Sequence, residues 1–128
     1  MVNQLLAGVH IASAMEAMAL AIKSGLDADT VFKVITASAG NSWMCENRVP
    51  HVLENDYSPK SAVDIFIKDL GIVLAQGERL DFPLPISQTA LQRFQEAKDM
   101  GLGRADDASV IKVYQRDGGF ALPGDEET

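Results

Sequence analysis

Two amide side chains, Asn3 and Gln4, are the first residues of the chain that could bind a ligand. An amide donates and accepts hydrogen bonds, so it can hold a hydroxyl or a carboxylate group. On a helix, Asn3 shares an arc with the polar residues that follow it, whereas Gln4 lies on the opposite, apolar side. A buried amide without a partner costs about 1–3 kcal/mol. Gln4 therefore needs a side chain, a neighbouring domain or a ligand as partner, unless it is simply solvated at a frayed helix end.

A second pair of candidate residues, Lys68 and Asp69, lies within a predicted helix over about residues 58–80. Lys68 falls in the middle of the polar arc of that helix. Asp64, four residues earlier, could form a surface ion pair with it, worth only about 0.3–0.5 kcal/mol. Periodicity alone favours this surface pair over a functional role for Lys68.

The remaining reactive side chains indicate no metal centre and no nucleophile. His10 and His51 lie far apart in the sequence and have no Cys or His at a zinc-like spacing, so no metal site is predicted. Cys45 has no adjacent His or Lys to form a thiolate, which favours a buried, inert thiol. We interpret Trp43 as a packing residue. Asn41 and Ser42 are expected to end one helix and cap the next, although their loop could also border a substrate cleft.

The elements that must position these residues are all helical, because no stretch alternates polar and apolar residues as a strand does. The sequence predicts an all-α fold of about six helices. Their expected spans are 1–24, 27–38 with Asp27 as N-cap, 42–48 with a break at Pro50, 58–80 with Ser58 as N-cap and Pro59 at N1, 85–100, and 106–116 with Asp106 as N-cap. Residues 1–116 are expected to form the domain, and residues 117–128 a flexible acidic tail or an artificial remnant.

The first helix is unusual in two respects. Between Val9 and Ile22 only His10, Ser13 and Glu16 are polar, so other helices or a partner chain must surround it. No Ser, Thr, Asp or Asn precedes Val2 to cap its first turn. Either the helix frays from a natural start, or an upstream segment has been removed.

Composition limits the possible functions further. The chain has 128 residues and a net charge of −7, which fits one domain and argues against nucleic-acid binding. The interrupted apolar runs argue against a membrane span or a signal peptide. A single cysteine cannot form an internal disulfide, so we expect a reducing, cytoplasmic location.

Five segments in order resemble the C-terminal helical domain of the 3-hydroxyisobutyrate dehydrogenase-like (β-hydroxyacid dehydrogenase) family. They are "MVNQLLAGVHIASAMEAMALAIKSGLDADTVFKVI", "SAGNSWMCENRVP", "IFIKDLGIVL", "FPLPISQTALQRFQEA" and "GLGRADDASVIKVY". The resemblance covers residues 1 to about 115 and implies the fold of the 6-phosphogluconate dehydrogenase C-terminal domain. Within the family, these segments are most similar in sequence to the branch that oxidises four-carbon sugar acids, the L-threonate dehydrogenase type.

The resemblance implies a two-domain oxidoreductase. An N-terminal Rossmann domain would hold NAD or NADP, and the helical domain would close the active site on a small hydroxy acid, such as threonate or 3-hydroxyisobutyrate, and form a homodimer. No G-x-G-x-x-G after a strand occurs in these 128 residues, so we expect a dehydrogenase fragment that is inactive alone. The alternative is a free-standing helical self-association module without catalysis.

The resemblance also assigns the candidate site residues. The family's catalytic lysine stands in the pattern K-x-x-N-[NQ] and would precede Met1 by one position, which leaves no catalytic residue in the chain. Asn3 and Gln4 would then bind substrate. Lys68 and Asp69 match the family's K-D-L motif and would lie on the cofactor side of the cleft. No metal is implied.

Overall fold

A computed structural model describes residues 1–125, and in these residues it contains helices and no strand. The α-helices are α1 (Val2–Lys23), α2 (Ala28–Thr36), α3 (Trp43–Leu53), α4 (Val63–Arg79), α5 (Pro85–Ala97) and α6 (Ile111–Gly118). A π-helical turn (Lys98–Leu102) extends α5, and a 3-10 turn (Asp107–Val110) leads into α6. The predicted all-α class with about six helices is confirmed.

Three of the predicted N-caps are present. Asp27 accepts a hydrogen bond from the Thr30 backbone N–H at 3.0 Å, and Ser42 accepts one from the Cys45 N–H at 3.0 Å. Asp106 accepts one from the Ala108 N–H at 3.1 Å. At the first helix, Met1 is the N-cap and makes no side-chain capping bond, as the sequence predicted. Local polar side chains therefore define these helix starts.

Two predicted helix boundaries are wrong. α4 begins at Val63, not at Ser58 and Pro59. Ser58 instead closes a turn by donating its N–H and hydroxyl to Asp56. α3 does not stop before Pro50 but continues through it to Leu53. Contacts with the core outweigh the backbone hydrogen bond that the proline removes, because the α3 residues on either side of it, Val49 and Val52, are fully buried.

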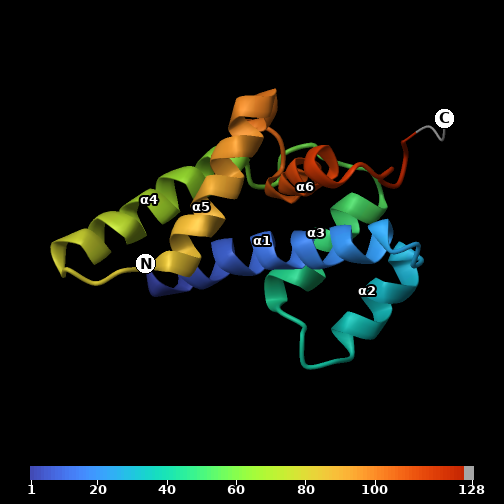
Figure 1. The fold of residues 1–128 in the computed structure, drawn as a ribbon, viewed down its shortest axis with the longest axis horizontal. Coiled ribbons are helices and arrows are strands. Elements are labelled where there is room, and N and C mark those ends of the chain that lie inside the picture. The colour runs from blue at the N-terminus through green and yellow to red at the C-terminus, as the bar shows by residue number, and fades with distance from the viewer. Residues whose placement is uncertain (126–128) are drawn as a thin grey trace.

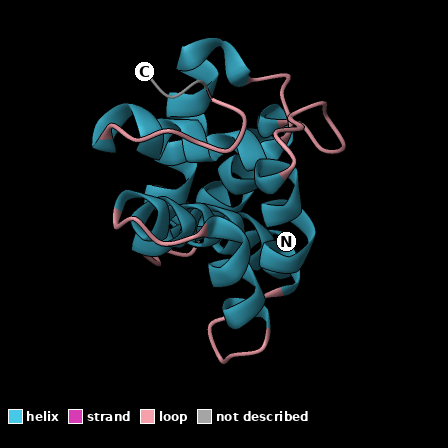
Figure 2. Cartoon of the chain, turned by 90° about the vertical axis from the view of Figure 1, so that its right-hand side faces the viewer, coloured by secondary structure: helices cyan, strands magenta, loops and turns pink. Residues whose placement is uncertain are grey.

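α1 is the central helix of the bundle, and it packs against α3, α4, α5 and α6. Figure 1 shows α1 along the long axis of the molecule, with α4 and α5 near its N-terminal half and α2 near its C-terminal end. Ile11, Met15 and Met18 are fully buried along it. α1 is long and apolar enough to span a membrane. The central helix of a helical bundle can have the same length and composition. In Figure 2 helices make up most of the fold and loops lie at its edges.

Close packing of α1 against α4 depends on a glycine. A Cβ atom at Gly8 would lie 3.0 Å from Leu70 Cδ1 and 3.1 Å from Phe66 Cδ1. Phe66 in turn stacks on Phe94 of α5, with ring centroids 5.4 Å apart. The absence of a side chain at position 8 lets the two helices approach closely just after the first turn of α1.

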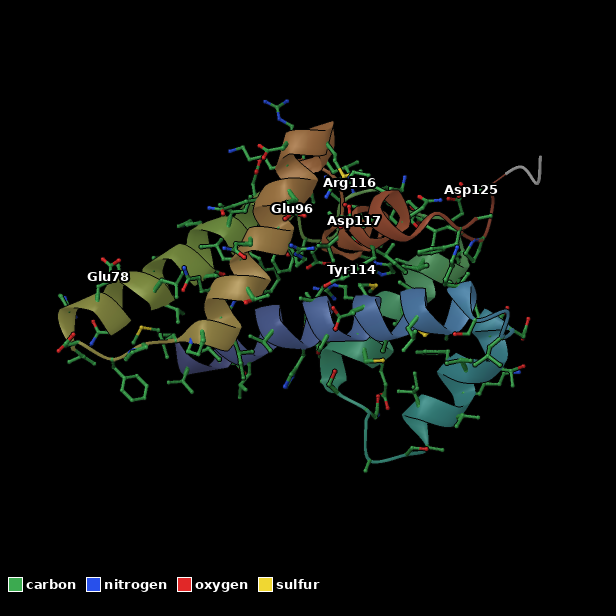
Figure 3. All side chains as sticks on the ribbon, viewed as in Figure 1. Glu78, Glu96, Tyr114, Arg116, Asp117 and Asp125 are labelled. Atoms are coloured by element: carbon green, nitrogen blue, oxygen red, sulfur yellow. The ribbon has the colours of Figure 1, made fainter. Side chains whose placement is uncertain are left out.

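Part of the segment predicted as a flexible tail contacts the domain. Leu122 is 4% exposed and belongs to the core. Asp125, labelled in Figure 3 beyond the end of α6, accepts hydrogen bonds from the Leu122 N–H at 2.9 Å and from Gln115 Nε2 at 2.6 Å. Residues 126–128 of the predicted tail lie outside the described residues.

Polar contacts also connect α6 to its neighbours. Arg116 on α6 forms ion pairs with Glu96 on α5 at 3.0 Å and with the adjacent Asp117 at 2.9 Å (Figure 3). Tyr114 donates its hydroxyl to the Ala12 carbonyl of α1 at 3.4 Å. The Arg116–Glu96 and Tyr114–Ala12 contacts hold the C-terminal helix on α5 and α1.

Candidate functional site

A cavity of about 690 Å³ lies between the N-terminal half of α1 and the first turns of α3 and α4. It contains both amides that the sequence singled out. Its lining combines neutral polar and apolar side chains with one histidine and one arginine. The lining residues are Asn3, Gln4, Leu6, Ala7, His10, Asn41, Ser42, Trp43, Met44, Arg48, Ser61, Ile65 and Phe66.

Gln4 connects the two predicted groups of site residues. Its Nε2 donates a hydrogen bond to Asp69 Oδ2 at 2.8 Å, across the α1–α4 contact. Its Oε1 accepts one from Asn3 Nδ2 at 3.1 Å. The partner that Gln4 needed is thus a carboxylate from α4. Asn3, Gln4 and Asp69 are therefore connected at one edge of the cavity.

Lys68 does not join this group. It is exposed, and within residues 1–125 no recorded hydrogen bond or ion pair includes its ammonium group. The predicted surface pair with Asp64 is wrong, because Asp64 Oδ1 faces Lys98 Nζ at 3.8 Å instead. Adjacent residues on a helix point in different directions, so Asp69 faces α1 while Lys68 faces outward.

Trp43 is a lining residue that sequence reasoning misjudged. It is 67% exposed and borders the cavity, so its interpretation as a packing residue is wrong. It is the first residue of α3, directly after the N-cap Ser42, where a helix has few neighbours. An exposed tryptophan beside a cavity of mixed polar and apolar lining is available for contact with a ligand or another domain, which its hydrophobicity alone does not reveal.

Arg48 is a second lining residue that the sequence did not single out. Its Nε donates to Asp107 Oδ1 at 2.7 Å, and the Asp107 side chain is fully buried. Burial raises the pKa of Asp107 to about 6, although the Arg48 hydrogen bond opposes this rise. The adjacent acids Asp106 and Asp107 were the only signal in the sequence.

Asp106 has a structural role next to this pair. It accepts hydrogen bonds from His51 Nδ1 at 2.8 Å, from the Lys60 N–H at 3.1 Å and from the Ala108 N–H at 3.1 Å. Its side chain is fully buried. The carboxylate connects α3, the segment before α4 and the turn before α6, so it fixes the wall of the cavity that Ser61 lines.

The other reactive groups are structural. Cys45 is buried, and desolvation raises the pKa of its thiol, which agrees with the predicted inert thiol. Asn41 donates through Nδ2 to Glu46 Oε1 at 2.6 Å, ahead of the Ser42 cap. In residues 1–125 no three His, Cys, Asp or Glu side chains are grouped as metal ligands.

Comparison with known proteins gives a consistent relationship. A family model described as NAD-binding of NADP-dependent 3-hydroxyisobutyrate dehydrogenase matches residues 1–114. L-Threonate dehydrogenase of Cupriavidus necator is 57% identical over 98% of this chain and 41% of its own length. The enzyme of the same name from Escherichia coli K12 is 53% identical over 96% of this chain and 40% of its length. The chain thus spans about 40% of the curated relatives it matches.

Solved structures agree with the fold. The 3-hydroxyisobutyrate dehydrogenase of Salmonella typhimurium superposes with a TM-score of 0.87 at 55% identity, covering 88% of this chain and 39% of that one. The Mycobacterium tuberculosis enzyme of that name, solved with L-serine, superposes with a TM-score of 0.79 at 27% identity, covering 88% and 40%. The family model spans the helices that build the cavity, and the chain therefore belongs to the 3-hydroxyisobutyrate dehydrogenase-like family of oxidoreductases.

Proposed function

We propose that this chain is the substrate-side domain of an NAD(P)-dependent dehydrogenase that oxidises a small hydroxy acid. L-Threonate is the first candidate substrate, because the relatives at 51–57% identity carry that name, and 3-hydroxyisobutyrate is the second. The observation that carries the proposal is the 2.8 Å hydrogen bond from Gln4 to Asp69. It connects the two predicted motifs at the edge of a cavity large enough for a four-carbon acid.

Gln4 and Asn3 would hold the substrate in this proposal. The carboxylate of Asp69 fixes the Gln4 amide by accepting one of its two N–H groups. The second N–H and the remaining lone pair of Oε1 can then bind a substrate hydroxyl or carboxylate. A half-buried amide held on both sides loses little freedom when it binds, which favours a defined substrate orientation.

The reaction would need groups outside these 128 residues. NAD(P), bound by the Rossmann domain that the family resemblance implies, supplies the hydride acceptor. The family's lysine would stand one helical turn before Gln4 and on the same side of α1. It would take the hydroxyl proton and stabilise the developing oxyanion. Lys68, exposed on α4, would face the cofactor.

The test uses the full-length protein that carries this chain. We expect L-threonate or 3-hydroxyisobutyrate to reduce NAD or NADP, followed by the absorbance of the reduced nicotinamide, and the isolated chain to be inactive. Gln4→Ala should lower kcat/KM at least about 100-fold, whereas Gln92→Ala, an exposed amide on α5, should leave it unchanged. Turnover by the isolated chain, or none by the full-length protein with either acid, would contradict the proposal.

We also propose that the full-length enzyme is a homodimer formed through this domain. Large apolar side chains remain exposed on α1 and α5, namely Val2 at 70%, Leu20 at 69% and Ile86 at 70%. Sedimentation of the full-length protein should give a dimer, and a monomer would contradict this. The alternative of a self-association module without catalysis requires an oligomer that lacks any dehydrogenase activity.

A further inference from the structure

The charge of the cavity differs from the charge of the chain. The whole sequence carries a net charge of −7. Among the residues that line the cavity, however, the ionisable side chains are His10 and Arg48, and none is acidic. Two carboxylates lie near this lining: Asp107 pairs with Arg48 through Nε, and Asp69 lies at the α1–α4 edge. An anionic ligand is therefore favoured at the guanidinium nitrogens of Arg48 that Asp107 leaves unpaired. The lining therefore offers a cationic group to a ligand, although the chain as a whole is acidic.

Arg48 has donors left for such a ligand. A guanidinium carries five N–H donors, and one recorded hydrogen bond, from Nε to Asp107 Oδ1, uses a single donor. Within residues 1–125 no acceptor is recorded for its two terminal nitrogens, and neither is among the buried polar atoms without a partner. The Arg48 side chain is 14% exposed. Its free nitrogens are therefore accessible, and the residue lines the cavity.

Asp107 holds this guanidinium in place. Its side chain is fully buried, so the bond to Arg48 is shielded from solvent. Its backbone N–H donates to the carbonyl of Ser61, another lining residue, at 2.7 Å. A guanidinium held at Nε keeps its planar, two-nitrogen edge free, and that edge matches the geometry of a carboxylate.

We propose that Arg48 binds the carboxylate of the hydroxy-acid substrate and makes the cavity selective for acids over uncharged alcohols. This inference rests on the proposed function and adds a specificity-determining residue to it. Gln4 and Asn3 bind polar groups at the α1–α4 edge, and Arg48 binds the anionic group from α3. Asp107 acts through Arg48 and is a positioning residue.

The experiment compares a charged substrate with an uncharged one in the full-length enzyme. KM and kcat are measured for L-threonate and for its methyl ester, in the wild type and in Arg48→Met and Arg48→Lys. Losing a charge-assisted bond should raise KM for the acid about 10- to 100-fold and change KM for the ester by less than about threefold. Arg48→Lys keeps the positive charge but lacks the two parallel N–H donors of a guanidinium. Its KM for L-threonate should lie between the values for the wild type and Arg48→Met. Arg104→Met removes an exposed arginine outside the cavity lining and serves as the matched control.

A second variant separates binding from folding. Arg48→Met leaves the buried carboxylate of Asp107 without its partner and could unfold the protein. The double variant Arg48→Met/Asp107→Asn removes this unpaired charge as well. If the double variant is folded and binds L-threonate as tightly as the wild type by calorimetry, the inference is wrong. Equal losses for acid and ester would also overturn it. Failure of the wild-type enzyme to oxidise any hydroxy acid would instead contradict the proposed function, while weaker calorimetric binding of L-threonate by Arg48→Met would still support the inference.

Discussion

Two aspartates of the domain, Asp69 and Asp106, are used in opposite ways. Asp69 is half-buried at the edge of the cavity, and within residues 1–125 its side chain accepts one hydrogen bond, from Gln4. Asp106 is fully buried and accepts hydrogen bonds from α3, from the segment before α4 and from its own turn. The first carboxylate keeps capacity for a ligand nearby, whereas the second is saturated by the protein.

The difference shows how the domain separates stability from recognition. A fully buried carboxylate is tolerated only when hydrogen bonds replace its lost hydration, so every partner of Asp106 contributes to folding. A half-buried carboxylate retains part of its hydration and can lose a partner at small cost. The following four predictions test this contrast through the free energy of unfolding of the 128-residue chain.

The largest effect is expected at Asp106. Asp106→Ala leaves His51 and the backbone N–H groups of Lys60, Ser61 and Ala108 without their acceptor. It should lower the free energy of unfolding by about 3–5 kcal/mol. Urea denaturation measures this change. Glu78→Ala, an exposed acid on α4, is the control and should stay within about 0.5 kcal/mol. If Asp106→Ala lowers the free energy of unfolding by less than about 1 kcal/mol, Asp106 does not contribute more to folding than a half-buried carboxylate such as Asp69 does.

The next effect is a pH dependence at Asp107. Its pKa is raised by burial to about 6, from 3.8 when unperturbed. Between about pH 4 and pH 6 the native carboxyl therefore keeps a proton that the unfolded chain has released, so this group destabilises the fold as pH rises. The stability of the wild type relative to Asp107→Asn should fall by about 1–3 kcal/mol from pH 4 to pH 7. Paired urea titrations at both pH values measure it, and a constant difference would contradict it.

A smaller effect is expected at Gln4. Gln4→Ala removes one hydrogen bond to a half-buried carboxylate, so it should cost about 0.5–1.5 kcal/mol in the same urea experiment. The full-length enzyme should nevertheless lose at least about 100-fold in kcat/KM, as stated above. A stability loss as large as that of Asp106→Ala would show that the amide serves folding and would weaken its assignment to substrate.

The smallest effect is expected at Lys68. It is exposed and has no recorded partner in residues 1–125, so Lys68→Met should change the free energy of unfolding by less than about 0.5 kcal/mol. If Lys68 faces the cofactor, the same variant should raise KM for NAD(P) in the full-length enzyme. Unchanged cofactor kinetics would leave Lys68 as an ordinary surface residue.

The sequence was sufficient where one segment determines its own structure. The capping residues Asp27, Ser42 and Asp106 were predictable because their acceptors serve N–H groups two or three residues away. The start of α4 was not, because Asp106, distant in the sequence, binds the segment before it. The helical continuation through Pro50 likewise depends on tertiary burial.

In the candidate site, too, local features were predictable from the sequence, and contacts between distant segments were not. The apolar position of Gln4 showed that its amide needs a partner, but periodicity could not identify Asp69, which lies 65 positions away. Arg48 gave no local signal either, because its role depends on the buried Asp107 that holds it. The exposure of Trp43 depends on how the first turn of α3 meets α1 and α4. All three depend on packing between helices.

The glycine at position 8 affects how far the Gln4–Asp69 distance can change when the helices move. It lies one turn after Gln4, and Leu70, which it contacts, directly follows Asp69. The contact between α1 and α4 at Gly8 and Leu70 therefore lies only a few residues from the Gln4–Asp69 hydrogen bond. Tilting of the far ends of α1 and α4 changes the amide–carboxylate distance little, whereas a methyl group at position 8 would require the Leu70 and Phe66 side chains beside it to shift by a few tenths of an ångström. The alignment of these two polar groups thus depends less on motion of the distant helix ends than on the packing of side chains against position 8.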